Sequence, residues 1–369
     1  MTNATVTTPS GQPLGISHKP SPTEAMFDEF KAANKPAFIG YLPYGFPDSD
    51  YSLKAFRTMV EHGVDAVEIG LPYSDPVMDG PVIQAASQIA IDNGEKIANV
   101  FKAVETVANA GGVPLVMSYW NLIYHYGVER FARDFENAGG AGLITPDLIP
   151  DEAGEWIEAS DRHGLDRIFL VSPDSTDSRL KVVAGNARGF VYAAARMGVT
   201  GERSTIDASP EELVARTRNA GAKNVCVGIG VSTAEQGARV GSYADGVIVG
   251  SALVHTMLDE SGKNAVDEAT GLKALAAKAE ELADGVHNAR VARCTLLPIS
   301  VVHAPYRMRG LPSGNHDTCI HSIANDFAVF HRSSNDSYLC VVHFDGNRPC
   351  SMDNHHTLEK VGWQFRPSA

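Results

Sequence analysis

The chain has 369 residues, of which 44% are hydrophobic and 20% charged, a globular composition that excludes collagen, coiled coils and wholesale disorder. Asp and Glu outnumber Lys and Arg by 44 to 31, and the resulting net charge of −13 argues against nucleic acid as a partner. No apolar run approaches the ~18 residues that would predict a membrane span, so no membrane partner is expected.

Residues 1–20 are rich in Ser, Thr, Pro and Gly and contain one Lys and no Arg. They lack the pattern of a secretory signal and the Arg-rich pattern of a transit peptide. We therefore expect a disordered lead-in at 1–20, followed by a cytoplasmic protein. The capping-box pattern, Ser followed three positions later by Glu, then predicts helix starts at 21–24, 209–212 and 232–235.

Eight short runs stay apolar without alternating, which is typical of strands buried on both faces of a parallel sheet. They lie at 37–42, 66–69, 114–117, 142–144, 168–171, 190–193, 225–228 and 247–249. Helical patterns separate them, at 51–61, 95–110, 128–137, 151–163, 177–183 and 233–240. Eight βα units in ~250 residues predict a (β/α)8 TIM barrel preceded by a helix. An open doubly wound sheet is the alternative, but no G-x-G-x-x-G motif follows the first run.

Catalytic groups of such barrels lie at the carboxyl ends of the strands, and Glu68 interrupts the second apolar run there. Val67 and Ile69 point to one face of the strand and Glu68 to the other, which we expect to be the barrel interior. Poor solvation would raise the pKa of this carboxyl group and let it both donate and accept a proton near neutral pH. A salt-bridged structural Glu is the alternative.

The following loop, residues 71–81, holds three prolines and the two aspartates Asp75 and Asp79. The prolines predict a rigid acidic lid above Glu68. Asp79 is a second candidate catalytic group if its side chain points inward, and only a helix cap if it does not.

Glycines follow three consecutive strands of the second half, at Gly201, Gly230 and Gly250, the last of them directly before Ser251. They let backbone N–H groups approach a phosphate dianion, and phosphate often binds after strands 7 and 8 of these barrels. The alternative is that each Gly only permits a tight turn.

Residues 67–84, Val-Glu-Ile-Gly-Leu-Pro-Tyr-Ser-Asp-Pro-Val-Met-Asp-Gly-Pro-Val-Ile-Gln, resemble the signature of the tryptophan synthase alpha chain family. Segments 41–48, 117–121, 146–148 and 196–201 support the resemblance, which covers about residues 21–290. It implies a catalytic (β/α)8 barrel over 21–290. The implied reaction is the lyase cleavage of indole-3-glycerol phosphate to indole and glyceraldehyde 3-phosphate, in the last steps of tryptophan biosynthesis.

By this resemblance, Glu68 matches the acid–base carboxylate, which takes the proton of the side-chain hydroxyl and protonates the ring carbon that leaves. Asp79 matches the carboxylate that accepts a hydrogen bond from the indole N–H. Further positions match phosphate binders (Gly201, Gly230, Gly250 and Ser251), pocket residues (Tyr41, Tyr119, Ile144, Leu170, Tyr192 and Ile229) and the lid loop (Thr200). Core packing is the alternative for any single aromatic residue.

The resemblance also implies a partner, a tryptophan synthase beta chain that carries pyridoxal phosphate in an α2β2 complex and receives indole through a tunnel. Neither a cofactor nor a metal is expected on this chain. Asp147 and the loop near 73–79 match the face that communicates with the beta chain.

The last 76 residues differ from the rest. Residues 294–369 hold four of the five Cys and seven of the 13 His, and their six basic and six acidic residues leave the whole charge of −13 to residues 1–293. We expect an atypical, poorly ordered C-terminal extension with a short strand at 338–344. A zinc site is a weaker alternative, because no pair of C-x-x-C or H-x-x-x-H spacings completes one.

Other functions remain open at this point. One is a non-catalytic barrel that activates a beta chain by binding alone, which has no need for two acids at the barrel mouth. Others are an isomerase of a phosphosugar and a lyase that releases indole without a beta chain.

Overall fold

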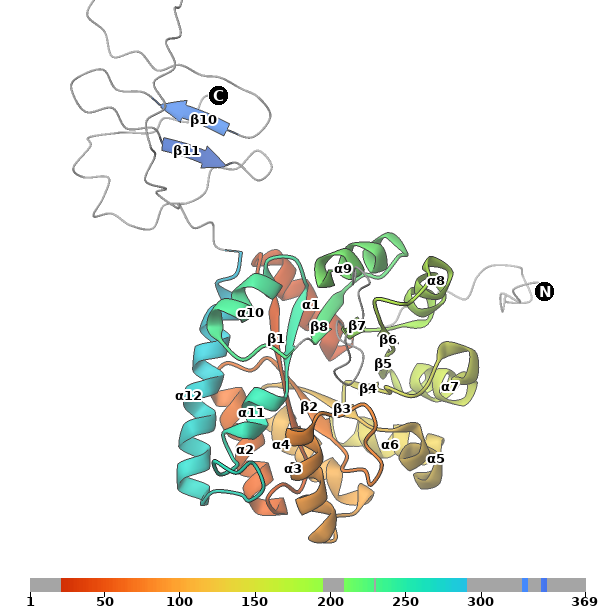
Figure 1. Ribbon diagram of the computed structural model, residues 1–369. Coiled ribbons are helices and arrows are strands. Elements are labelled where there is room, and N and C mark those ends of the chain that lie inside the picture. The colour runs from red at the N-terminus through yellow and green to blue at the C-terminus, as the bar shows by residue number, and fades with distance from the viewer. Residues whose placement is uncertain (1–20, 195–208, 229, 291–326, 331–339, 344–369) are drawn as a thin grey trace, which may run out of the picture. The chain divides into compact units, whose positions relative to one another are not determined.

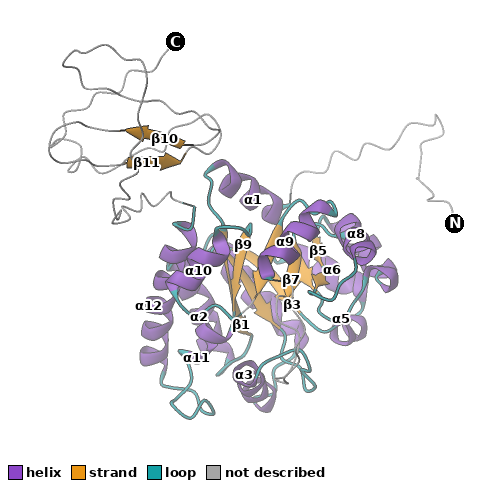
Figure 2. Ribbon diagram, turned by 45° about the horizontal axis from the view of Figure 1, so that its top comes forward, coloured by secondary structure: helices purple, strands orange, loops and turns teal. Residues whose placement is uncertain are grey.

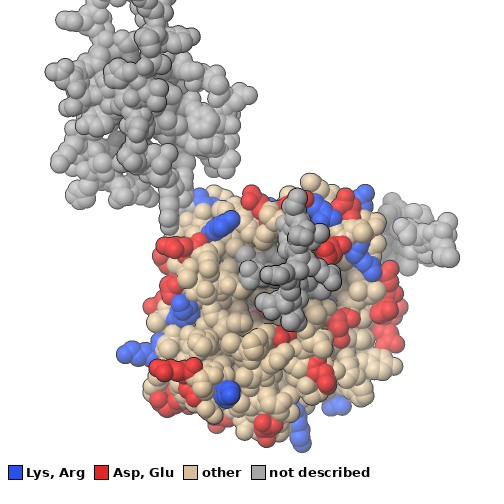
Figure 3. All heavy atoms as spheres, viewed as in Figure 1, with Lys and Arg blue, Asp and Glu red and all other residues tan. Residues whose placement is uncertain are grey.

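The computed structural model describes residues 21–194, 209–228, 230–290, 327–330 and 340–343. The chain divides into two units, Met1–Arg290 and Val291–Ala369. Within the described residues, no helix combines the length and apolarity that a membrane crossing requires. On the face drawn in Figure 3, acidic and basic side chains are interspersed around the first unit.

Strands and helices alternate through the first unit (Figure 1). The strands are β1 (Ala37–Pro43), β2 (Ala66–Gly70), β3 (Val113–Met117), β4 (Gly142–Ile144), β5 (Asp166–Ile168), β6 (Leu170–Val171), β7 (Val191–Ala194), β8 (Val225–Gly228) and β9 (Gly246–Val249). The helices are α1 (Pro22–Ala32), α2 (Ser49–Glu61), α3 (Pro81–Asp92), α4 (Val100–Asn109), α5 (Trp120–Tyr126), α6 (Val128–Asn137), α7 (Gly154–His163), α8 (Asp177–Asn186), α9 (Pro210–Asn219), α10 (Ala234–Gly241), α11 (Ser251–His255) and α12 (Glu268–His287). Two 3-10 turns, η1 (Ile97–Asn99) and η2 (Pro150–Glu152), precede α4 and α7.

The strands form a closed parallel barrel, which confirms the predicted fold class. Consecutive strands pair in the order β5-β4-β3-β2-β1-β9-β8-β7-β6. The first strand pairs with the last, Ala37 opposite Gly246, which excludes the open doubly wound sheet. Only Phe169 separates β5 from β6, so these two pieces occupy the place of the predicted fifth strand. Helices surround the strands (Figure 2).

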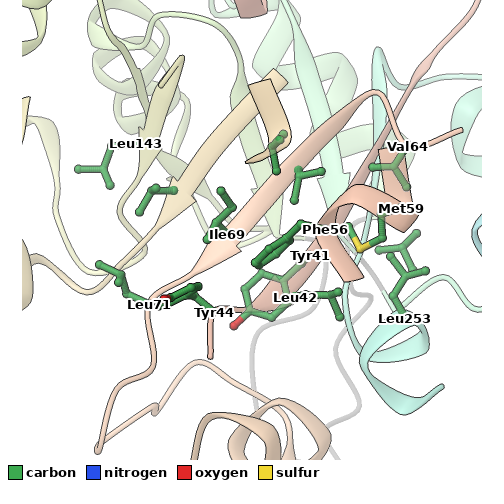
Figure 4. Packing of buried hydrophobic residues seen from close by; sticks show 14 of the residues in the cluster. Tyr41, Leu42, Tyr44, Phe56, Met59, Val64, Ile69, Leu71, Leu143 and Leu253 are labelled. Carbon is green, nitrogen blue, oxygen red and sulfur yellow. The ribbon is translucent and has the colours of Figure 1, made fainter. Parts of the chain in front are cut away.

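Two layers of apolar side chains hold the barrel. The inner layer includes Ile39, Leu115, Ile144, Ile168, Phe190, Cys226 and Ile248, together with Met26 and Phe27 of α1. Because Phe27 packs edge-on against Phe190, with ring centroids 5.9 Å apart, α1 closes one end of the interior. The outer layer lies between strands and helices. It includes Met59, Val64 and Leu253 beside β1 (Figure 4). These three side chains pack so closely on Gly40 that a Cβ added there would lie within 3.1 Å of an atom of each.

Most helix starts lie where the sequence predicts them. Ser21 forms a complete capping box with Glu24, and Ser209 accepts the N–H of Glu212. The capping box predicted at 232–235 is wrong by one position, because Thr233 is the N-cap of α10. The backbone N–H of Ser232 instead donates to Gln236, and two adjacent hydroxyl residues compete for one cap.

In the second unit, β10 (Phe327–Phe330) pairs antiparallel with β11 (Cys340–His343). The position of β11 agrees with the strand expected at 338–344. The expected disordered lead-in and most of the expected poorly ordered extension lie outside the described residues.

Candidate active site

Glu68 is the central residue of β2 and is buried, with 1% of its surface exposed. Its Oε1 atom has no hydrogen-bond partner among the described residues. Burial raises the pKa of this carboxyl group to about 8. Among the described residues Glu68 forms no salt bridge, which the structural alternative would require. Its charge adds to the effect of burial in raising the pKa of Tyr192 on β7 and of the Cys226 thiol on β8.

Asp79 lies at the end of the β2–α3 loop and is partly buried. Burial raises the pKa of its carboxyl group to about 6. Gly80, not Asp79, is the N-cap of α3, and no side chain caps that helix. The cap alternative for Asp79 is therefore wrong, and its side chain is available for another role.

The charges of both acids act on the same two tyrosines. The carboxylates of Asp79 and Glu68 both raise the pKa of Tyr41 on β1 and of Tyr192 on β7, in addition to the larger effect of burial. Tyr41 is the register partner of Glu68 on the neighbouring strand. Tyr41 and Tyr192 therefore each lie within electrostatic reach of both acids.

Glycines make room for these two rings. A Cβ on Gly70 would lie 2.4 Å from the hydroxyl of Tyr41, and a Cβ on Gly228 would lie 2.5 Å from the hydroxyl of Tyr192. Neither glycine is among the predicted site residues. Their places at the strand ends are visible in the sequence, but the ring that each accommodates comes from a neighbouring strand.

Two side chains, that of Tyr119 at the N-cap of α5 and that of Gln84 in α3, bind the acidic loop that carries Asp79. The hydroxyl of Tyr119 accepts the N–H of Met78 at 3.0 Å, and the side-chain amide of Gln84 donates to the carbonyl of Asp79 at 2.9 Å. The ring of Tyr119 also stacks on Tyr73, with centroids 4.6 Å apart. Tyr119 thus contacts the loop that carries Asp79, and its place in the indole pocket stays a prediction.

Part of the predicted phosphate site is described. Gly230 follows β8 with a φ of +76°, a left-handed conformation that favours glycine, and nothing would lie within 4 Å of a Cβ added there. Gly250 and Ser251 form the start of α11 after β9, and a Cβ on Gly250 would lie 3.4 Å from Tyr41. The phosphate candidate Gly201, the lid residue Thr200 and the pocket residue Ile229 lie outside the described residues.

The two remaining pocket candidates belong to the barrel interior. Ile144 on β4 is fully buried in the inner layer, and Leu170 on β6 packs against that layer. No group of three or more metal-ligating side chains occurs among the described residues.

Asp147 lies at the outer surface, where it caps a helix. Its two carboxylate oxygens accept the N–H of Trp120, the first residue of α5, at 2.9 and 3.1 Å. A surface cleft of about 410 Å³ adjoins it, lined by Trp120, Asn121, Tyr124, Asp147, Leu148 and Glu152. Large apolar side chains are exposed in the adjacent segments: Val77, Met78, Tyr124 and Ile149.

Known proteins match the first unit. The family model described as tryptophan synthase alpha chain matches residues 27–287. The tryptophan synthase alpha chain of Bifidobacterium longum (strain NCC 2705) is 83% identical over 290 residues, which cover 79% of this chain and 99% of that protein. That of Mycobacterium marinum (strain ATCC BAA-535 / M) is 52% identical over 261 residues, which cover 71% and 93%.

Solved structures agree. A chain of tryptophan synthase from M. tuberculosis, in an aminoacrylate-bound form, matches with 46% identity and a TM-score of 0.65, over 72% of this chain and 99% of that one. The tryptophan synthase subunit alpha from Legionella pneumophila str. Paris matches with 29% identity and a TM-score of 0.63, over 73% and 100%. The fold, the signature at 67–84 and these matches agree: the chain belongs to the tryptophan synthase alpha chain family.

Proposed function

We propose that this chain cleaves indole-3-glycerol phosphate with Glu68 as its acid–base group and Asp79 as the carboxylate that accepts a hydrogen bond from the indole N–H. The observation that carries the proposal is the buried Glu68, whose pKa of about 8 keeps it protonated at neutral pH. Retro-aldol cleavage at an indole carbon needs an acid first and a base second. One carboxyl group with a pKa near neutrality serves both purposes.

In the first step, protonated Glu68 donates its proton to C3 of the indole ring. Positive charge then develops on the ring and its N–H. Asp79, whose pKa is raised only to about 6, is mostly ionised at neutral pH and accepts a hydrogen bond from that N–H. A charge-assisted hydrogen bond in a poorly solvated site stabilises this indolenine form.

In the second step, the Glu68 carboxylate takes the proton of the hydroxyl on the carbon attached to C3. The C–C bond breaks, its electron pair returns to the ring, and the hydroxyl-bearing carbon becomes the aldehyde of glyceraldehyde 3-phosphate. Glu68 ends protonated, as it began, so no external proton is needed. Neither step requires a cofactor on this chain.

We expect the substrate to bind across the barrel mouth. The phosphate would bind backbone N–H groups at Gly201, Gly230, Gly250 and Ser251. Tyr41, Tyr119, Ile144, Leu170, Tyr192 and Ile229 would surround the indole. Thr200 would contact Asp79 from the lid loop.

The beta chain is the partner, and it carries the pyridoxal phosphate. We place its contact surface on the cleft beside Asp147 and on the loop 73–79, because this region combines exposed Val77, Met78, Tyr124 and Ile149 with an open cleft. Exposed apolar patches of this kind are typical of protein interfaces. Indole released near Glu68 would leave toward this face.

We assign the catalytic domain to 21–290, the lead-in to 1–20 and an accessory extension to 294–369, and we place the protein in the cytoplasm. The family match ends at residue 287, before the second unit begins. A chain that ends after Arg290 is expected to keep its kcat. Loss of activity in that truncated chain would contradict the assignment.

The test of the proposed function is an indole-release assay with indole-3-glycerol phosphate, with and without the beta chain. Glu68→Gln is expected to lower kcat by at least about 100-fold, as for loss of a general acid–base group. Asp79→Asn is expected to lower kcat by at least about 100-fold, as for loss of a group that stabilises the charge developing on the ring. Binding of glyceraldehyde 3-phosphate should remain, which separates a chemical from a structural loss. Near-full turnover by Glu68→Gln would overturn the mechanism.

A further inference from the structure

We propose that the hydroxyl of Tyr119 is a positioning group for Asp79, because it holds the main chain of the acidic loop at Met78. The inference deepens the proposed function and rests on the role of Asp79 in it. It assigns to Tyr119 a task separate from lining the indole pocket.

The loop has little else to fix it to the barrel. Val77 is 83% exposed and Met78 is 42% exposed, so burial contributes little there. The N–H of Val77 donates to Asp75 and that of Asp79 to Pro76, which shapes the loop internally. Gln84 binds the carbonyls of Pro76 and Asp79, but it belongs to the helix that the loop leads into.

The bond from Met78 to Tyr119 is different, because it joins the loop to another βα unit, 41 positions away. The other described hydrogen bonds of residues 72–79 all have partners within residues 72–84, and only this one reaches another part of the chain. Segments with few buried contacts open easily, so one tertiary bond has a large effect on where such a loop lies. Met78 immediately precedes Asp79.

Tyr119 is itself rigidly placed. It is the N-cap residue of α5, it is 7% exposed, and its ring stacks on Tyr73. The next N–H, that of Trp120, is held by both carboxylate oxygens of Asp147. Because the residue is held in this way, its hydroxyl is a hydrogen-bond acceptor at a fixed position for the loop backbone.

The geometry connects this fixed point to the chemistry. The amide that Tyr119 holds is that of Met78, directly before Asp79 in the chain, and the charge of Asp79 adds to the larger effect of burial in raising the pKa of the Tyr119 phenol. Without the bond, the loop backbone gains freedom and the carboxylate of Asp79 spends more time in water, away from the indole N–H. The phosphate turns and the pocket walls on the other strands stay in place, so substrate binding changes less than turnover does.

The test compares Tyr119→Phe with the wild type in the full chain, assayed with its beta chain. Phe keeps the ring and its stack on Tyr73 and removes only the hydroxyl. Tyr126→Phe is the matched control, since it removes a hydroxyl at the other end of α5, one that donates to Asp134 at 2.8 Å. Tyr119→Phe is expected to lower kcat about tenfold, as for one lost hydrogen bond, and to change KM by less than about threefold.

Two further readouts separate positioning from packing. In Tyr119→Phe, the acid limb of the pH profile of kcat/KM should move to lower pH, because a better solvated Asp79 loses the effect of burial on its pKa. The Met78 amide should exchange about tenfold faster with solvent. Tyr126→Phe should change neither readout.

The outcomes also distinguish this inference from the function on which it rests. If Asp79→Asn is inactive while Tyr119→Phe keeps the wild-type kcat and acid limb, the positioning role is wrong and the function stands. A rise in KM alone would likewise overturn the inference in favour of pocket lining. If Asp79→Asn is fully active, the proposed function itself fails.

Discussion

Ser21 and Asp166 join α1 to the barrel through a single hydrogen bond. The Ser21 hydroxyl donates to the Asp166 carboxylate at 2.6 Å, across 145 positions of sequence, while the same oxygen accepts the N–H of Glu24 at 3.1 Å. Asp166 is fully buried at the start of β5, and Arg188 lies 3.8 Å away. One side chain thus caps the helix and fixes it over the closed end of the barrel, opposite to Glu68.

We expect Ser21→Ala to destabilise the fold more than an ordinary cap mutation does. The lost cap costs about 1 kcal/mol, and the lost bond to a carboxylate adds about 1.5 to 3 kcal/mol. Ser209→Ala is the matched control, because Ser209 also caps a helix that begins with Pro, and its hydroxyl bonds only the N–H of Glu212 among the described residues. Burial raises the pKa of Asp166 to about 6, so the carboxyl group is ionised at about pH 7.5, where urea unfolding measures both changes in free energy. Equal losses in the two variants would show that the Asp166 bond contributes nothing.

This pair also shows how far sequence reasoning reaches. The cap at Ser21 is local, since Ser, Pro and Glu stand within four positions, and the sequence predicts it. The bond to Asp166 is tertiary, and no spacing points to it. The same holds for Tyr119 and Met78, because the family resemblance predicts Tyr119 as a pocket residue and says nothing of its hydroxyl bond to the loop.

Most strands are predictable because they are apolar runs, whereas β5 begins with Asp166 and Arg167, before the predicted run at 168–171. The inward direction of Glu68 follows from the alternation of side chains along β2. The break between β5 and β6 at Phe169 cannot be predicted from the sequence, because apolar composition does not indicate where the hydrogen bonds between strands are interrupted. The place of Asp79 requires the structure, since it depends on the path of an irregular loop. The packing role of Gly70 and Gly228 could not be predicted, because each accommodates a tyrosine ring from a neighbouring strand.

The pH dependence of turnover is expected to have two limbs. Asp79 must be ionised to accept the indole N–H, and burial raises its pKa to about 6, so kcat/KM should fall below about pH 6. Glu68 must be protonated to donate first, and burial raises its pKa to about 8, so kcat/KM should fall again above about pH 8. Indole release measured across this range checks both limbs. A flat profile would rule out these two groups as the titrating pair.

Glu68 should also reduce stability at high pH. Its folded-state pKa of about 8 lies above the ordinary value of 4.5, so the folded protein binds more protons than the unfolded chain between these values. Stability is therefore greatest below the unfolded pKa and is lost as pH rises through the folded one. At about pH 8 we expect Glu68→Gln to be more stable than the wild type by about 2 to 4 kcal/mol, and near pH 4 the difference should be small.

Urea unfolding of the wild type and Glu68→Gln at the two pH values measures this difference. The difference in free energy of unfolding between the two proteins at each pH excludes the titration of every other carboxylate, because both proteins share those groups. A gap that does not widen with pH would mean that Glu68 ionises as readily in the folded protein as in the unfolded chain. The mechanism would then lose its proton donor at neutral pH.

The two glycines beneath the tyrosine rings should not tolerate a side chain. In Gly70→Ala, the new Cβ would lie 2.4 Å from the Tyr41 hydroxyl and 2.6 Å from its ring atoms, so the stiff ring must move away from Glu68. Overpacking of this kind costs about 1 to 3 kcal/mol, and displacement of the ring should also lower kcat. Gly185→Ala in α8 is the control, since nothing lies within 4 Å of its Cβ, and it should stabilise the helix by about 0.5 to 1 kcal/mol. Unfolding and indole-release assays on both variants measure these effects, and unchanged stability and turnover in Gly70→Ala would show that the Tyr41 ring is free to move without consequence.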